Sequence, residues 1–205
     1  SEVYPPLLRT RLGQEAPGCL WAKGNLDILS MPSVSLVGSR ALKERNRRFA
    51  REVGIQAAKQ GFALISGNAR GADSAAQDAC LEAGGYVVSV LADSLNEYCP
   101  DAHRLYLSED DYDECFSVLR ALHRNRVIHA LSDGVFVAQC TLERGGTWYG
   151  SVQNLRKSWS NLYCFRDGSP AADALAQMGA FLIDEKMLAD FRALPTRQPS
   201  LFHMR

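Results

Sequence analysis

The sequence has no surplus of charge and no long apolar segment. Its 23 basic residues balance its 23 acidic residues, giving a net charge of +0. Any contact with a nucleic acid would therefore need a local basic patch. No apolar run approaches the roughly 20 residues of a membrane-spanning helix, and no signal peptide is visible. We therefore expect a cytoplasmic protein without a membrane partner.

Closely spaced metal ligands and catalytic groups are also missing. The six cysteines are scattered without a Cys-x-x-Cys pair, which predicts reduced thiols and not a disulfide framework or zinc site. His123 and His129 have no neighbouring ligand pattern, so we expect them to be surface or hydrogen-bonded histidines. No nucleophile triad or carboxylate pair is evident. The sequence predicts no metal, no cofactor and no catalytic residue, and it favours binding over catalysis.

Short apolar runs alternate with helical stretches along the chain. We expect main strands at about 34–37, 62–65, 86–91, 134–138 and 162–165, with shorter ones at 105–107 and 180–183. Helices are expected at about 42–59, 75–83, 116–131, 147–157, 171–178 and 185–193. This alternation predicts an α/β, Rossmann-like fold: a doubly wound, mostly parallel sheet with helices on both faces.

Three segments are expected along the chain. Residues 1–30 are rich in turn signals and predict a lead-in segment, packed on the core, with a short strand near 19–22. Residues 31–185 form the Rossmann-like domain. Residues 186–205 complete the chain as a C-terminal helix and tail.

An octapeptide, residues 66–73, lies between a buried strand and an Ala-rich helix. Gly67 and Gly71 let the backbone approach a phosphate closely, and Arg70 adds a fork of donors. Asp73 is expected to be the N-cap of the helix. The segment is either an anion-binding turn or a tight strand-to-helix turn without a ligand.

Two further turns combine small residues with a strand end or a helix start. They are Gly38-Ser39-Arg40 and Gly145-Gly146-Thr147, the second with a hydroxyl expected at the helix cap. Ligands of open α/β sheets bind outside the carboxyl ends of the strands, so we expect the three turns to share one site. Arg124 and Arg126 are two residues apart and cannot share a helix face. One should face this edge while the other pairs elsewhere.

Several motifs, in order, resemble the DNA-processing protein A (DprA/Smf) family. They are Tyr4-Pro5-Pro6-Leu7-Leu8, Gly38-Ser39-Arg40, Ser66-Gly67-x-Ala69-Arg70-Gly71-x-Asp73, and Arg124-Asn125-Arg126 with Leu131-Ser132-Asp133. The resemblance implies a Rossmann-like domain that binds single-stranded DNA and hands it to the RecA recombinase during DNA uptake. It also implies a homodimer. DNA-backbone contacts are implied at Arg40, Ser66, Gly67, Arg70, Arg124 and Arg126, and the turns add Gly38, Ser39, Gly71, Asp73, Asn125, Gly145, Gly146 and Thr147 as phosphate-binding residues.

Two positions depart from family patterns. Asn68 stands where the DprA family usually has an apolar residue, and the sequence offers no explanation for it. Gly145-Gly146-Thr147 is closer in style to the LOG-type nucleotide phosphoribohydrolases of the wider superfamily, which use Gly-Gly-x-Gly-Thr-x-x-Glu. Here Gly150 stands where that pattern has its catalytic acid, which favours binding over catalysis. A nucleotide-binding sensor or a LOG-like phosphoribohydrolase is kept as the alternative hypothesis.

The tail, Gln198-Pro199-Ser200-Leu201-Phe202, resembles the Gln-x-x-Leu-Phe peptide that docks DNA-handling proteins on the bacterial sliding clamp. Leu201 and Phe202 would fill an apolar pocket, and Gln198 would form a hydrogen bond at its rim. Alternatively, the apolar pair folds back onto the domain.

Overall fold

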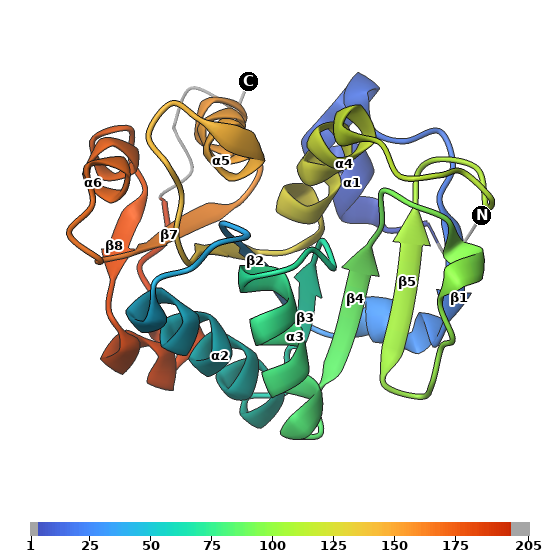
Figure 1. The fold of residues 1–205 in the computed structure, drawn as a ribbon, viewed down its shortest axis with the longest axis horizontal. Helices are drawn as coiled ribbons and strands as arrows, with labels where there is room; N and C mark the ends of the chain where they lie inside the picture. Colours follow the sequence, from blue (N-terminus) through green and yellow to red (C-terminus); the bar gives the residue numbers. More distant parts are fainter. Residues whose placement is uncertain (1–3, 198–205) are drawn as a thin grey trace.

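A computed structural model describes residues 4–197 and contains one eight-stranded sheet (Figure 1). The strand order is β1-β5-β4-β3-β2-β6-β7-β8, and every described pair is parallel except the antiparallel β1–β5. The strands are β1 (Trp21–Gly24), β2 (Ser33–Val37), β3 (Ala63–Ser66), β4 (Tyr86–Val90), β5 (Arg104–Ser108), β6 (Gly134–Val137), β7 (Asn161–Phe165) and β8 (Phe181–Ile183). The predicted mostly parallel sheet is confirmed.

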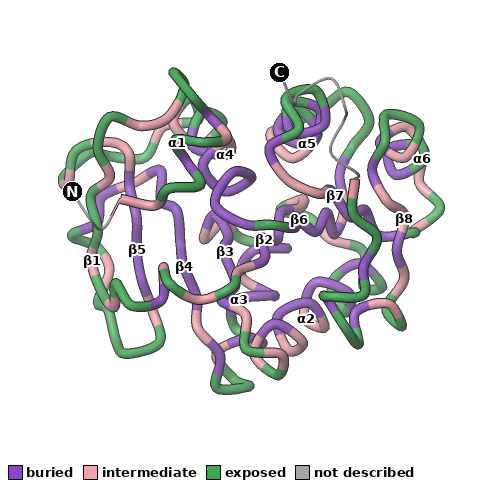
Figure 2. Tube along the Cα trace, turned by 180° about the vertical axis from the view of Figure 1, so that it is seen from behind, coloured by how far each residue is buried: buried purple, intermediate pink, exposed green. Residues whose placement is uncertain are grey.

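Helices cover both faces of the sheet, as predicted. They are α1 (Pro6–Leu12), α2 (Glu44–Lys59), α3 (Ala72–Glu82), α4 (Val118–Leu131), α5 (Gly145–Lys157) and α6 (Pro170–Gln177). Helices α1, α4, α5 and α6 contribute to one apolar cluster, and α2 and α3 contribute to the other. Figure 2 shows that the strands between these two layers are largely buried.

Burial explains why these residues form these elements. Parallel strands covered on both faces need continuous apolar runs, and Val135, Phe136 and Val137 of β6 are fully buried. Helix α2 buries Phe49 and Val53 on a single face, as their helical spacing predicts.

The lead-in segment differs from the prediction. Its prolines and glycines predict turns, but residues 6–12 form helix α1. Pro6 occupies the first helical position, where its missing N–H costs nothing. Leu8 and Leu12, four residues apart, are buried in the core. The expected strand lies slightly later in the chain, as β1, and forms the antiparallel edge of the sheet beside β5.

The helix expected at 185–193 is wrong. The chain forms two 3-10 helices, Glu185–Ala189 and Phe191–Ala193, separated by Asp190 in an extended conformation. The Asp190 carboxylate accepts the N–H of Arg192 at 2.9 Å, which starts a new turn and prevents a continuous helix. Within residues 4–197, no helix is both long and apolar enough to cross a membrane.

The connections place a crevice between β2 and β6. From β2 the chain continues through α2 to β3 on one side, whereas from β6 it continues through α5 to β7 on the other. The two strands are neighbours and end together, with Val37 paired to Val137. The loops that follow them therefore diverge, which is the switch point where open α/β sheets bind ligands.

Candidate functional site

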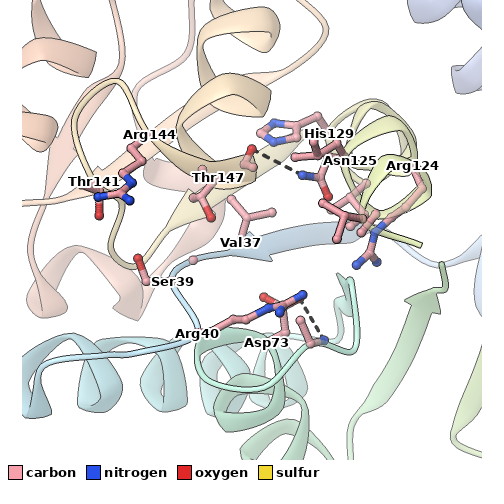
Figure 3. Close-up of a pocket in the computed structure, with 18 residues that line it drawn as sticks. Val37, Ser39, Arg40, Asp73, Arg124, Asn125, His129, Thr141, Arg144 and Thr147 are labelled. Atoms are coloured by element: carbon pink, nitrogen blue, oxygen red, sulfur yellow. Dashed lines mark hydrogen bonds between the residues drawn. The ribbon is translucent and has the colours of Figure 1, made fainter. Parts of the chain in front are cut away.

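Two adjoining pockets occupy this edge of the sheet. The first pocket, of about 380 Å³, lies at the switch point between the loop after β2, helix α4 and the start of α5 (Figure 3). The second pocket, of about 520 Å³, lies beside the ends of β3 and β4. Arg40, Ala69 and Arg124 line both pockets. The three turns identified in the sequence thus meet at one edge.

Asp73 stabilises the octapeptide turn from inside helix α3. Its Oδ2 accepts the backbone N–H groups of Gly67 at 3.1 Å and Ala69 at 3.3 Å. The N-cap of the helix is Gly71, so the expectation that Asp73 is the cap was wrong. Burial raises the pKa of the Asp73 carboxyl, and these two hydrogen bonds act in the opposite direction. The carboxylate thus fixes the turn, and Asp73 also lines the first pocket.

Arg124 forms the junction between the two pockets. Its side chain extends from α4, donates a hydrogen bond to the carbonyl of Val90 at the end of β4, and is only 5% exposed. The guanidinium lies directly against Gly67, so that a Cβ at that position would collide with it. Burial lowers the pKa of Arg124, and the carboxylates of Asp73 and Asp93 oppose this. A largely desolvated cation at this point favours an anionic ligand.

The turns after β2 and β3 are joined through their backbones. The N–H of Ala72 donates to the carbonyl of Ser39 at 3.2 Å. Gly71 has φ 94° and lies so close to the carbonyls of Ser39 and Arg40 that no side chain fits. Arg40 and Arg70 extend from these two turns and are exposed. The pair of turns thus presents two solvated cations at the mouth of the pockets.

Helix α5 begins two residues earlier than predicted. Its first residue is Gly145 and its N-cap is Arg144, with no side-chain hydrogen bond to the cap in the described chain. The expected cap at Thr147 was therefore wrong, since Thr147 is the third helical residue and lines the first pocket. The uncapped first turn of a helix carries unpaired N–H groups and a partial positive charge. This end of α5 can therefore stabilise an anion.

The backbone explains Asn68. Its φ of 55° lies in the left-handed region, which strongly disfavours β-branched residues and which Asn tolerates best after Gly. Asn68 also lines the second pocket together with Tyr98. Burial and the neighbouring Asp93 raise the pKa of Tyr98 to about 12, so its phenol stays neutral.

The structure brings most of the predicted site residues together. Those that line a pocket are Gly38, Ser39, Arg40, Gly67, Arg70, Asp73, Arg124, Asn125, Gly145, Gly146 and Thr147. Ser66 and Gly71 line neither pocket among residues 4–197. The hydroxyl of Ser66 donates to the carbonyl of Leu36 at 2.9 Å, which gives it a scaffold role. The tail residues Gln198, Leu201 and Phe202 lie outside the described residues.

Arg126 points away from both pockets. Its guanidinium forms a two-pronged ion pair with Glu109, with N–O distances of 2.9 and 2.6 Å, and its Nε donates to the carbonyl of Glu15. The prediction that Arg124 and Arg126 take different directions is confirmed. The structure does not bring Arg126 to the site.

Sequence reasoning missed His129, which lines the first pocket. The side chain is 1% exposed, and neither ring nitrogen has a hydrogen-bond partner among the described residues. The expectation of a surface or hydrogen-bonded histidine was wrong for this residue. Burial lowers its pKa to about 4. The available signal was its position four residues after Asn125, which places both on one helix face.

The sequence model of the DNA recombination-mediator protein A family matches residues 1–158. The chain belongs to this family. The pneumococcal DNA processing protein DprA, from Streptococcus pneumoniae, is 32% identical over 206 residues, an alignment that covers 93% of this chain and 69% of that protein. The chain spans a smaller share of the Escherichia coli protein Smf: 34% identity over 156 residues covers 71% of this chain and 41% of Smf.

Solved structures of the DprA family share the fold. The X-ray structure of the pneumococcal protein superposes with a TM-score of 0.77 at 31% identity and covers 89% of this chain and 68% of that one. A structure of DNA processing protein A from Helicobacter pylori, whose description concerns its single-stranded DNA binding mode, gives a TM-score of 0.76. At 22% identity, with 90% of both chains covered, this second likeness shows the fold alone.

Proposed function

We propose that this DprA-family chain binds single-stranded DNA in DNA processing and recombination. The observation that carries this proposal is the convergence of Arg40, Arg70 and Arg124 on one sheet edge of a chain whose net charge is +0. A local basic patch on a neutral protein is the footprint expected of a nucleic-acid site. The family membership supports the same function.

The chemistry of the patch suits a phosphate backbone. Arg40 and Arg70 are exposed and can release counterions from the strand, while Arg124 adds a fixed, desolvated charge to the pocket that all three line. Contacts of this kind go to phosphates and carry no sequence information. Phe116 and Leu122, which are 52% and 46% exposed, line the second and first pockets and offer apolar surfaces to the bases. The site would therefore accept single strands of any sequence.

Fluorescence anisotropy with a labelled oligothymidylate tests this proposal. The double variant Arg40→Ala/Arg70→Ala should bind at least tenfold more weakly than the wild type. Each phosphate contact contributes about −0.7 to the slope of log K against log salt for single strands, so the variant's slope should be shallower by about 1.4.

Arg156 supplies a matched control for charge. It is exposed in the last turn of α5, the opposite end of that helix from the pocket. Arg156→Ala should leave both the affinity and the salt slope close to the wild type. Equal affinities for the wild type and the double variant would refute the assignment of the site.

Partners beyond DNA follow from the family resemblance. We infer a RecA-type recombinase as the acceptor of the bound strand, a second copy of the chain as a dimer partner, and the cytoplasm as the place of action.

Docking of residues 198–202 on the sliding clamp stays a prediction. Truncation before residue 198 should abolish clamp binding and leave the affinity for DNA unchanged.

A further inference from the structure

His129 is not explained by its surroundings. A buried imidazole normally has a hydrogen-bond partner at one or both nitrogens. Here both nitrogens lack one among residues 4–197, although the side chain is almost fully buried. His129 lines the first pocket, and a ligand oxygen that reached one of the ring nitrogens would supply the missing partner.

The position of His129 relates it to the start of helix α5. A Cβ at Gly150 would lie 3.1 Å from Nε2 of His129, so the absence of a side chain at position 150 makes room for the imidazole. Gly145, Gly146 and Thr147, one turn earlier on the same helix, line the same pocket with an uncapped first turn. Figure 3 shows His129 and Thr147 on the same side of the pocket, opposite Arg40. The uncapped helix start and the unpaired imidazole thus belong to one cavity.

We infer that the first pocket binds the terminal phosphate monoester of a nucleotide, with the phosphate at the start of α5 and a nucleotide oxygen hydrogen-bonded to His129. This deepens the proposed DNA-binding function and rests on it. The phosphate comes either from the 5′ end of a DNA strand or from a free nucleoside monophosphate. The cavity, of about 380 Å³, is within the size range of small-molecule sites.

A monoester fits these groups better than an internal diester. It has three free oxygens and up to two negative charges, whereas a diester within a strand has two free oxygens and one charge. The first pocket offers the first-turn N–H groups of α5, the Thr147 hydroxyl, and the guanidinium groups of Arg40 and Arg144. With a pKa of about 4, His129 is uncharged at pH 7 and acts as a hydrogen-bond partner, not as another cation.

The test compares two oligothymidylates that differ only at the 5′ end, one phosphorylated and one with a hydroxyl, each labelled at the 3′ end. Thymidine 5′-monophosphate is titrated in parallel by calorimetry. The wild type should bind the phosphorylated strand at least fivefold more tightly. His129→Leu and Thr147→Val should each lose this preference, whereas Arg70→Ala should weaken both strands equally. Thermal melting confirms that each variant is folded, and half-buried Thr147 supplies the test if His129→Leu does not fold.

The outcomes separate the two sources and the two proposals. A preference for the phosphorylated strand alone assigns the site to strand ends, and binding of the monophosphate alone assigns it to a free nucleotide. If the two strands bind equally and the monophosphate does not bind, the inference is overturned, while loss of affinity in Arg70→Ala still supports DNA binding. A preference that persists in both folded variants also overturns it, because the phosphate is then held elsewhere.

Discussion

The buried imidazole of His129 should make the stability of this protein depend on pH. An unfolded histidine has a pKa of 6.5, whereas burial lowers the pKa of His129 to about 4 in the folded state. Below pH 6.5 the unfolded chain therefore binds a proton that the folded chain does not. Linkage requires the free energy of unfolding to fall as the pH falls through this window.

The size of the effect follows from the two pKa values. One pKa unit corresponds to about 1.36 kcal/mol, so His129 should lower the free energy of unfolding by about 2 kcal/mol between pH 8 and pH 5. The full loss approaches about 3 kcal/mol below pH 4. The contribution is absent well above pH 6.5, where the imidazole is neutral in both states.

Urea unfolding of the wild type and His129→Leu at pH 8, 7, 6 and 5 isolates this contribution. Other titrating groups are common to both proteins, so their effects cancel in the difference. The wild type should lose stability relative to the variant as the pH falls, by about 2 kcal/mol at pH 5. A difference that does not change with pH would show that His129 is accessible to solvent or paired, and would remove the physical basis for its role in the first pocket.

Three further predictions concern the turns and α4. Gly67→Ala should displace the guanidinium of Arg124, because the new methyl group would occupy its place. Anisotropy should show at least tenfold weaker DNA binding, and urea unfolding should show a free energy of unfolding lower by about 1–3 kcal/mol. Unchanged affinity would refute the contact. Arg126→Ala should cost about 3 kcal/mol, because the largely buried carboxylate of Glu109 then keeps only His123, at 3.4 Å, as a partner. Its affinity for DNA should change less than twofold, and a larger loss would show that Arg126 takes part in DNA binding. Asn68→Val should lower the free energy of unfolding by about 1–3 kcal/mol, because it places a β-branched residue at φ 55°, whereas Asn68→Gly should be tolerated. Equal melting temperatures of the two variants would contradict this.

The order of strands and helices could be predicted because the sheet is buried on both faces. Such strands must be continuous apolar runs, and these stand out between glycines and polar turns. Helix α1 was harder to predict, since Pro5 and Pro6 are turn signals as well as acceptable residues at a helix start. The division between Arg124 and Arg126 follows from helical geometry. Which of them faces the site depends on Glu109, which is distant in sequence.

Details of the site depend on contacts between segments. The sequence suggests a cap when a carboxylate stands near a helix start, but it does not show that the Asp73 carboxylate turns back to the N–H groups of Gly67 and Ala69. Similarly, the isolation of His129 depends on how α5 packs on α4, with Gly150 facing the imidazole. Local patterns carry no information on such long-range packing.

Because Arg40 and Arg124 line both pockets, the two candidate sites share the same two cations. An anion in either pocket neutralises part of the field that attracts an anion to the other. Occupancy of the two pockets is therefore linked by an unfavourable coupling free energy, and thermodynamic reciprocity requires each ligand to weaken the other by the same factor. If both pockets bind phosphates as proposed, the entry of a phosphate into one would weaken the binding of a strand in the other without any change in shape.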